Sequence, residues 1–437
     1  MFGALLPQLV TAIPGPKSLG MADMLAQTEC PALTMRRARR AERAGAAHDP
    51  VSWAEAEGAN VRDVDGNVFV DLTGGFGAAL FAHRHPPIVD AVQHQLGRLV
   101  HALGDLQPSA EKVALLTELA ALAPFPARVI LGLSGADAVE AALKTAMLAT
   151  KKPGIVAFEG GYHGLSHGPL AACGYGEGFR APFAAQLNPH VTFARYATAA
   201  DEVDAALRSL DDAVAALDGR AGALIIEPLQ GRGGVRVPAP GFLRAVGERA
   251  RRHGLLVIVD EIYTALGRTR GPFLHVEEGL DADLICIGKG LGGGFPISAC
   301  LGREAVMAAW GDPGGEAIHT STFLGNPIAC AAARATLAAL RREPLDERVA
   351  QVERQLRRAL GVLLGVQVQG RGLLLGVALP SGISVLATMR RLLERGYITV
   401  PAGAPPAVLC LTPPACLTET QVDGFARALA ACLSEPP

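Results

Sequence analysis

Short apolar segments alternate with helical patterns through the middle of the chain, and this alternation restricts the fold more than any other feature. Helical patterns cover 136–149 and 243–253. Strand-like apolar segments lie at 129–133, 155–158, 223–226, 255–259, 284–287 and 297–302. Short apolar strands separated by helices are typical of a largely parallel sheet covered on both faces. The expected fold class is therefore α/β, with a large, mostly parallel central domain.

The two ends of the chain carry a different pattern. An Asp65-Gly66 pair between apolar runs predicts a hairpin near the N-terminus. Further strands are predicted at 366–368, 373–377 and 407–411, before a last helix at 419–433. We expect these ends to form one smaller α+β domain. The expected division is 1–85 and 328–437 for this smaller domain, and 86–327 for the large domain that binds the cofactor.

Composition excludes several classes of partner. The chain has 437 residues, 50% of them hydrophobic, and a formal net charge of -2. This balance gives no electrostatic reason to expect a nucleic acid, and the basic segment 35–43 is typical of a solvated helix face. No apolar stretch approaches the roughly 20 residues of a membrane span, and no signal-peptide pattern is present.

The eight cysteines are scattered and form no CxxC pair. Several lie inside apolar runs, a pattern typical of reduced, buried cysteines in a cytoplasmic protein. We therefore expect neither a disulfide framework nor a metal site.

Lys289 is one of only six lysines in a chain that carries most of its positive charge on arginine. It follows an apolar segment and precedes a glycine-rich stretch. An amine can lose its proton near neutral pH and attack a carbonyl, whereas a guanidinium cannot. The alternative is an ordinary lysine at a strand end, whose stem packs while its charge stays in water.

Two loops offer groups that can bind an anion. Ser134, Gly135 and Ala136 follow a predicted strand and open a helix, where free N–H groups form a ready anion site. A plain helix cap by Ser134 or Asp137 is the alternative. Thr322 adds a hydroxyl in a loop before another predicted helix.

Polar and aromatic residues follow three more predicted strands. Tyr162 and His163 come after one, and Glu227 and Gln230 come directly after another. Side chains at the carboxyl ends of parallel strands point towards the usual ligand crevice. Asp260 ends a continuous apolar strand, so its carboxylate needs a cationic or hydrogen-bonding partner. Taken singly, a tyrosine such as Tyr162 is more often an ordinary buried residue, and the alternative for Asp260 is a helix cap at the end of a strand.

An amine, a buried carboxylate, an anion site and an aromatic platform together are what pyridoxal phosphate (PLP) requires. Over nearly all of residues 50–430 the chain resembles the class III, or omega, aminotransferases of the fold type I PLP enzymes. Its most specific motifs are SGADAVEAALK, EPLQGRGG, VDEIYTALGRTR, GKGLGGGFPISA and STFLGNPIACAAA. The resemblance implies a transaminase that moves an amino group from an amine or omega-amino acid to 2-oxoglutarate or pyruvate.

The same resemblance implies catalytic roles for Lys289, which forms an imine with the cofactor, and for Asp260, which pairs with the pyridine nitrogen. Gln230 would approach the phenolic oxygen, and Tyr162 would stack on the ring. It also implies a homodimer with the cofactor at the subunit interface, where Thr322 would reach the phosphate of the other subunit's cofactor.

The phosphate would be bound by backbone N–H groups of Gly135 and Ala136. Further cofactor-site residues that the resemblance implies are Ser134 and Glu227, which lie in these motifs, and His163, which lies in the segment FEGGYHGLSHG.

Two positions depart from the family pattern. At these positions many members have arginines, which bind carboxylates. This chain has Leu165 and Cys410 instead. A 4-aminobutyrate-like or ornithine-like specificity is therefore in doubt. An amine without a carboxylate, or an aminated sugar or antibiotic precursor, is an equal alternative. Arg180 and Arg232 are the candidates to bind an acid instead. Phe76 is a candidate for lining the pocket, with an ordinary core phenylalanine as the alternative.

A PLP racemase, epimerase or aminomutase shares every cofactor residue, so Lys289 and Asp260 do not separate it from a transaminase. A nucleotide-binding protein is disfavoured, because the glycines of GKGLGGGF match neither phosphate-loop spacing. A catalytically silent relative is disfavoured by the retention of Lys289 and Asp260.

Overall fold

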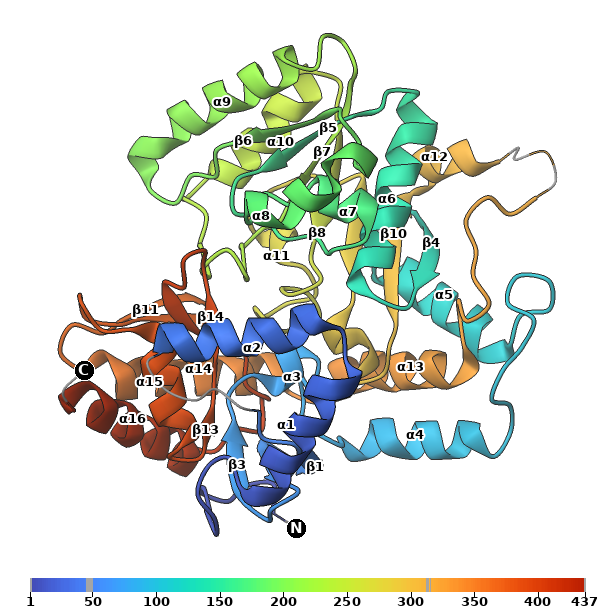
Figure 1. The fold of residues 1–437 in the computed structure, drawn as a ribbon. Coiled ribbons are helices and arrows are strands. Elements are labelled where there is room, and N and C mark those ends of the chain that lie inside the picture. The colour runs from blue at the N-terminus through green and yellow to red at the C-terminus, as the bar shows by residue number, and fades with distance from the viewer. Residues whose placement is uncertain (1, 45–49, 312–313, 315, 436–437) are drawn as a thin grey trace. The chain divides into compact units, whose positions relative to one another are not determined.

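A computed structural model describes residues 2–44, 50–311, 314 and 316–435 (Figure 1). The chain divides into two compact units, which are described separately. The terminal unit comprises Met1–His85 and Glu347–Pro437, and the central unit comprises Pro86–Asp346.

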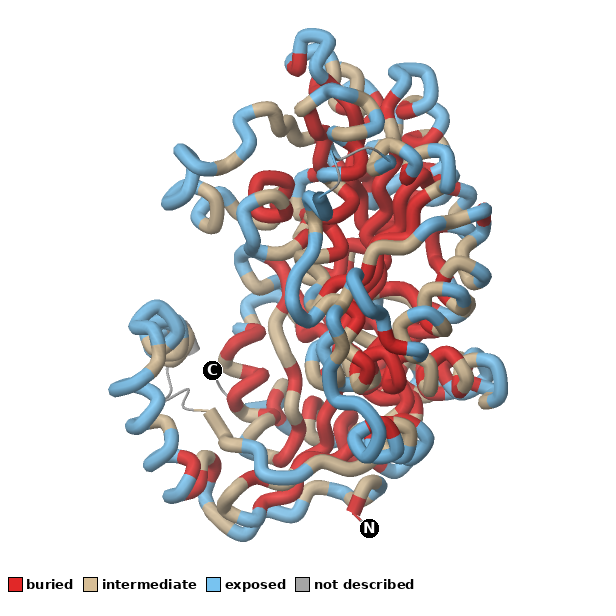
Figure 2. Tube along the Cα trace, turned by 90° about the vertical axis from the view of Figure 1, so that its right-hand side faces the viewer, coloured by how far each residue is buried: buried red, intermediate tan, exposed pale blue. Residues whose placement is uncertain are grey.

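The central unit contains a seven-stranded sheet with the order β4-β10-β9-β8-β7-β5-β6. Strand β10 is antiparallel to both of its neighbours, and the other six strands run in one direction. The strands are β4 (Ala127–Gly132), β5 (Gly154–Phe158), β6 (Val191–Ala194), β7 (Ala221–Ile226), β8 (Leu256–Asp260), β9 (Leu284–Ile287) and β10 (Ser298–Arg303). This sheet confirms the α/β fold class. Figure 2 shows the buried residues concentrated along its strands.

Helices cover both faces of this sheet. The helices of this unit are α4 (Pro86–Leu96), α5 (Ala110–Leu122), α6 (Gly135–Thr150), α7 (His167–Ala171), α8 (Glu177–Arg180), α9 (Val203–Ala215), α10 (Phe242–Arg252), α11 (Leu274–Glu277), α12 (Glu304–Met307) and α13 (Pro327–Arg342). Short 3₁₀ turns are η1 (Ala181–Gln186), η2 (Ala200–Glu202), η3 (Lys289–Gly292) and η4 (Ala308–Trp310).

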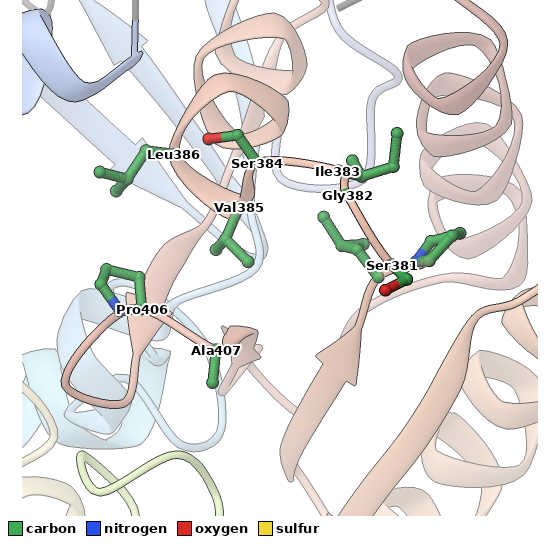
Figure 3. A pocket seen from close by; sticks show the side chains of 10 residues that line it. Ser381, Gly382, Ile383, Ser384, Val385, Leu386, Pro406 and Ala407 are labelled. Carbon is green, nitrogen blue, oxygen red and sulfur yellow. The ribbon is translucent and has the colours of Figure 1, made fainter.

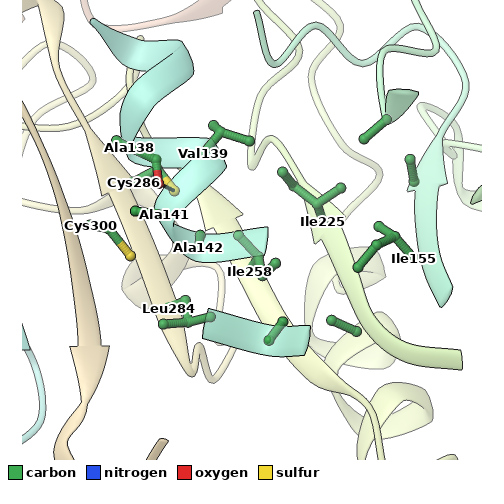
Figure 4. Packing of buried hydrophobic residues seen from close by; sticks show 14 of the residues in the cluster. Ala138, Val139, Ala141, Ala142, Ile155, Ile225, Ile258, Leu284, Cys286 and Cys300 are labelled. Atoms are coloured by element: carbon green, nitrogen blue, oxygen red, sulfur yellow. Dashed lines mark hydrogen bonds between the residues drawn. The ribbon is translucent and has the colours of Figure 1, made fainter. Parts of the chain in front are cut away.

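Helix α6 lies on one face through small side chains. Ala138 and Ala142 pack against Ile225 and Ile258 of the central strands (Figure 4). Alanines on this face of the helix let its backbone approach the sheet closely, which fixes the position of the helix start. Because successive side chains of a strand point to opposite faces, Phe158 in β5 points to the other side. There it packs on α10.

Strand β6 was missed by the sequence analysis. Its sequence, VTFA, is short, includes a threonine, and is only partly buried at the sheet edge. An edge strand needs less apolar surface than the central strands, so its pattern is weak.

The C-terminal boundary of the central unit differs from the expected one. Helix α13, which was assigned to the smaller domain, packs on α4 through Ala332 against Ile88 and Val92. Arg334 of the same helix also forms an ion pair with Glu118 of α5 (2.8 Å). These contacts keep α13 in the central unit, which therefore extends to Asp346.

The terminal unit joins both ends of the chain. Strand β13 pairs in parallel with β3, and Tyr397 lies opposite Val70. The first sheet has the order β1 (Trp53–Glu57), β2 (Asn60–Asp63), β3 (Val68–Asp71) and β13 (Tyr397–Ile398). The second has the order β11 (Gln367–Arg371), β12 (Leu374–Ala378), β15 (Val408–Leu411) and β14 (Val400–Ala402). The helices are α1 (Pro16–Thr28), α2 (Pro31–Ala44), α3 (Gly74–Gly77), α14 (Leu345–Gly361), α15 (Val385–Leu393) and α16 (Glu419–Ser434).

A pocket of about 330 Å3 lies in the terminal unit (Figure 3). It is lined by residues 379–386 with Pro406 and Ala407, and none of these lining residues is ionisable. A pocket without an acid, a base or a nucleophilic amine offers little chemistry. The residues that the sequence analysis assigned to the cofactor and to catalysis lie in the central unit.

Among the described helices, none is both long enough and apolar enough to cross a membrane. The same residues contain no group of three or more His, Cys, Asp or Glu side chains that could hold a metal ion.

Three aromatic rings support the face of the sheet under α10. Phe158, Tyr196 and Phe242 are almost fully buried, and their ring centroids lie 5.4 to 6.3 Å apart in edge-on pairs. We predict that Phe242→Ala lowers the free energy of unfolding by about 3–5 kcal/mol, because it leaves a cavity. Urea unfolding followed by circular dichroism measures this change.

The matched control is Val276→Ala, in which the replaced side chain is half exposed. That change should stay within about 0.5 kcal/mol of the parent. A Phe242→Ala protein as stable as the control would mean that the three rings do not support this face.

Candidate active site

The carboxyl ends of neighbouring strands bring the expected residues to one edge of the sheet. Asp260 ends β8, Glu227 follows β7 directly, and Lys289 stands two residues after β9. His163 lies in the loop after β5. Since β9, β8, β7 and β5 are consecutive in the sheet, these side chains gather in the position where open α/β sheets bind ligands.

A buried ion pair occupies the middle of this edge. His163 Nδ1 lies 2.8 Å from Asp260 Oδ2, and both side chains are buried. Asp260 Oδ1 accepts a hydrogen bond from the Ile262 N–H (3.1 Å). The pair supplies the partner that a buried carboxylate requires. His163 Nε2 is buried without a hydrogen-bond partner among the described residues.

Glu227 ties two loops together. Its Oε1 accepts the N–H of Tyr162 (2.7 Å) and its Oε2 accepts the N–H of Gly231 (3.1 Å). The two donors belong to the loops after β5 and β7. One carboxylate therefore fixes the spacing of both loops at the site.

Burial and neighbouring charges shift the pKa values of this cluster. Burial raises the pKa of Glu227 from 4.5 to about 7, with a further increase from the charge of Asp260 and a partial offset from His163. Burial alone would lower the pKa of His163. The hydrogen bond and charge of Asp260, with the charge of Glu227, raise it above its usual value instead. Both shifts favour the protonated forms near neutral pH.

Lys289 has a strained backbone at the start of η3. Its φ is +39°, in a region that non-glycine residues seldom adopt. Its Nζ lies 4.0 Å from the centroid of the Tyr263 ring, on the ring face. Such strain persists only where the surroundings hold it, and it clusters at functional sites. The sequence analysis did not identify Tyr263 as a neighbour of this amine.

The start of α6 combines a cap with free donors. Ser134 and Asp137 form a capping box, and Ser298 Oγ donates to the Ser134 carbonyl (2.5 Å). The N–H groups of Gly135 and Ala136 have no hydrogen-bond partner among the described residues. The structure confirms the helix cap, and the cap leaves these two donors available, so it does not compete with the predicted anion site.

Ile262 is a site residue that the sequence analysis missed. A Cβ on Gly135 would lie 2.8 Å from Ile262 Cδ1, and one on Gly288 would lie 3.5 Å from its Cγ2. The isoleucine therefore stands between the start of α6 and the end of β9. An apolar residue two positions after Asp260 gave no separate signal within the motif.

Gln230 does not present an open amide. It is fully buried, its Nε2 donates to the Glu159 carbonyl (2.9 Å), and its Oε1 accepts from Arg236 (3.0 Å). These bonds hold the loop after β5. Tyr162 packs edge-on against Tyr175, and its face carries the guanidinium of Arg232.

The remaining candidates are spread more widely. The Arg180 guanidinium lies over Phe193 of β6 (4.3 Å). Thr322 is exposed in the turn before α13. Phe76 belongs to the terminal unit, where it is 60% exposed with a φ of +59°. This exposure excludes the alternative of an ordinary core phenylalanine.

Comparisons of the sequence find one consistent family. The family model described as aminotransferase class-III matches residues 43–433. The acetylornithine aminotransferase of Mycobacterium tuberculosis (strain ATCC 25618 / H37Rv) is 39% identical over 88% of this chain and 92% of its own length. The 4-aminobutyrate aminotransferase of Mycobacterium bovis is 37% identical, over 85% of this chain and 84% of its own length.

Solved structures give the same result. An amine transaminase from an uncultivated Pseudomonas species, in its PLP-bound internal aldimine form, superposes with a TM-score of 0.80 at 27% identity. That match covers 89% of this chain and 95% of the other. The ornithine aminotransferase of Toxoplasma gondii ME49 superposes with a TM-score of 0.80 at 27% identity, over 96% of both chains.

The raised pKa of Glu227 predicts how stability depends on pH. The folded state binds more protons than the unfolded state between pH 4.5 and about 7, so stability falls as pH rises through this window. Glu227→Gln removes this ionisation. We predict that the stability of the variant relative to the parent rises by up to about 3 kcal/mol from ~pH 5 to ~pH 8.

Urea unfolding at the two pH values, without added ligand, measures the difference. Glu248→Gln, which changes an exposed carboxylate on α10, is the control and should show no such trend. Parallel pH curves for the parent and Glu227→Gln would contradict the assignment of this ionisation to Glu227.

Proposed function

This chain belongs to the class III aminotransferases, and we propose that the carboxyl edge of its central sheet is the active site. It is a PLP-dependent transaminase of fold type I that moves an amino group from an amino donor to an oxo acid. The family, cofactor and reaction expected from the sequence are thereby confirmed. The observation that best supports the site is the placement of Lys289 and Asp260 at the carboxyl ends of the adjacent strands β9 and β8, with His163 paired to Asp260.

The residues at this edge fit the cofactor in three respects. The unpartnered N–H groups of Gly135 and Ala136 can bind its phosphate. Asp260 uses one lone pair of each oxygen for His163 and Ile262, so an acceptor remains for a protonated ring nitrogen. The buried face of Ile262 offers an apolar surface next to these groups.

When bound, the cofactor supplies a carbonyl that takes up the amino group and a ring that withdraws electrons from the donor carbon. We assign to Asp260 the task of holding a proton at the ring nitrogen. His163 orients this carboxylate through its Nδ1. His163 also places a compensating positive charge beside this buried carboxylate.

Lys289 would hold the cofactor through its amine. When an amino donor takes that place, the freed Nζ would accept the proton from the donor carbon and deliver it to the carbon on the other side of the nitrogen, two bonds away. The face of Tyr263 holds this amine close to the site. A general base must lie within hydrogen-bond reach of the proton it moves, and the fixed turn of η3 provides that placement.

Three further residues position these groups. Glu227 and Gln230 hold the loop that carries Tyr162, which we assign as the ring platform. Ser298 anchors the carbonyl of Ser134 and so the start of α6. Thr322 lies exposed in its turn, which supports a contact with the cofactor phosphate of a second subunit in a homodimer.

The names of the relatives support a donor whose amine is at the end of a carbon chain, as in acetylornithine and 4-aminobutyrate. Leu165 is half exposed and apolar, and therefore cannot donate a hydrogen bond to a donor carboxylate. We infer that this enzyme uses neutral amines, or donors whose second amine is masked, in preference to 4-aminobutyrate. We also propose that it acts in the cytoplasm.

Lys289→Ala is predicted to abolish transamination, because no other amine occupies its place. Lys152→Ala is the matched control, since Lys152 is exposed just before β5, at the amino end of that strand and not at its carboxyl end. The measurement is amino transfer to 2-oxoglutarate with a panel of amine donors, combined with the sedimentation of each variant. Substantial residual transfer by Lys289→Ala would refute the assignment of this lysine.

Asp260→Asn is predicted to lower kcat/KM by at least about a hundredfold, which corresponds to about 2.7 kcal/mol of barrier. An amide cannot hold the ring nitrogen in its protonated state. Steady-state kinetics measure the loss, and circular dichroism checks that the fold is retained. A rate within about tenfold of the parent would count against the pairing of Asp260 with the ring.

A further inference from the structure

We propose that Arg232 binds the carboxylate of the oxo-acid substrate. This inference rests on the proposed function and identifies the residue that recognises its acceptor. An oxo acid brings a carboxylate into the site, and neither Leu165 nor Cys410 can form charge-assisted hydrogen bonds to it. Another residue of this chain must therefore do so.

Arg232 lies in the loop after β7 and is held in an aromatic cage, formed by Tyr162, Tyr175 and Phe179. Its Cζ lies 4.6, 5.1 and 6.0 Å from the three ring centroids. The rings also pack on one another, with centroids 5.9 Å and 5.6 Å apart. A planar guanidinium stacked on rings keeps its face on the apolar surface and its N–H groups directed outwards in its plane.

Apart from the three rings, the charge of Arg232 has no anionic partner in the part of the chain that the structure describes. Among the residues that the structure describes, no carboxylate lies within ion-pair distance of its guanidinium, and its Nε is buried without a hydrogen bond. Arg236, in the same loop, instead donates to Gln230 (3.0 Å) and to the Tyr196 carbonyl (2.9 Å). A half-buried cation without an anion is costly, so the Arg232 site suits an external carboxylate.

Glu227 fixes this cation relative to the reacting groups. Its two oxygens bind the N–H of Tyr162, a ring of the aromatic cage, and the N–H of Gly231, the residue before Arg232. Tyr162 is followed by His163, which is paired with Asp260. A carboxylate on Arg232 therefore lies next to the ring platform.

Arg180 is the other candidate from the sequence, and its surroundings differ. Its guanidinium covers Phe193, a residue of the edge strand β6 that packs against the core under α6. Its Nε is also buried without a partner. Because Arg180 resembles Arg232 in charge and burial but lacks the aromatic cage, it provides the matched control variant.

The test uses the PLP-loaded enzyme and glutarate, a dicarboxylate with no amine or carbonyl group to react. Calorimetric titration gives the dissociation constant for the parent, Arg232→Gln and Arg180→Gln. We expect Arg232→Gln to weaken glutarate binding by about tenfold or more, and Arg180→Gln to change it by less than about threefold. The KM for 2-oxoglutarate should rise in Arg232→Gln by more than kcat falls.

Equal glutarate affinity in the parent and Arg232→Gln would overturn the proposal, and so would an equal loss in Arg180→Gln. If Arg232→Gln fails to take up the cofactor, the same glutarate titration is made with Arg232→Lys. It keeps the charge but loses the planar fork, so binding should weaken severalfold, and an unchanged affinity counts against Arg232. Failure of the proposed function differs from all of these results, because the parent itself would then not transaminate.

Discussion

Six strands that run in one direction must end at one edge of their sheet, and the site depends on this constraint. Their carboxyl ends bring together residues from loops far apart in the sequence, such as His163 and Asp260. Strand β10 is reversed, so its first residue, Ser298, lies opposite the last residue of β4. That reversal places the Ser298 hydroxyl against the start of α6. The direction of each strand therefore decides which of its ends contributes to the chemistry.

Burying the charged groups of this cluster lowers the stability of the folded state. Two carboxylates, Asp260 and Glu227, are buried within reach of one imidazole, and burial raises the pKa of Glu227 to about 7. A core of apolar residues would be more stable in the same space. Against the effect of burial, the hydrogen bond and charge of Asp260, with the charge of Glu227, raise the pKa of His163 above its usual value, so a cation stands beside the carboxylate that we assign to the ring nitrogen. The folded state is thus less stable than it would be with an apolar core, and in return charged groups are held in fixed positions at the reacting centre.

Much of this arrangement is visible in the sequence. The alternation of apolar strands and helices predicted the parallel sheet, and Lys289 and Asp260 stand out because each ends an apolar segment. The hydrogen bonds of Glu227 could not be predicted, since they join residues 65 positions apart through loops without periodicity. For the same reason the cage around Arg232 and the buried amide of Gln230 were not visible. Helix α13 was assigned to the wrong unit because its packing on α4 leaves no local pattern.

The attachment of the cofactor to Lys289 is the central claim, and chemical trapping tests it most directly. Reduction of the PLP-loaded enzyme with borohydride fixes the bond between the cofactor and its lysine, and peptide mass spectrometry locates the modified residue. The predicted result is a single modified peptide that contains Lys289, which disappears when an amino donor is added before reduction. Modification of another lysine, or none at all in an enzyme that transaminates, would contradict the account.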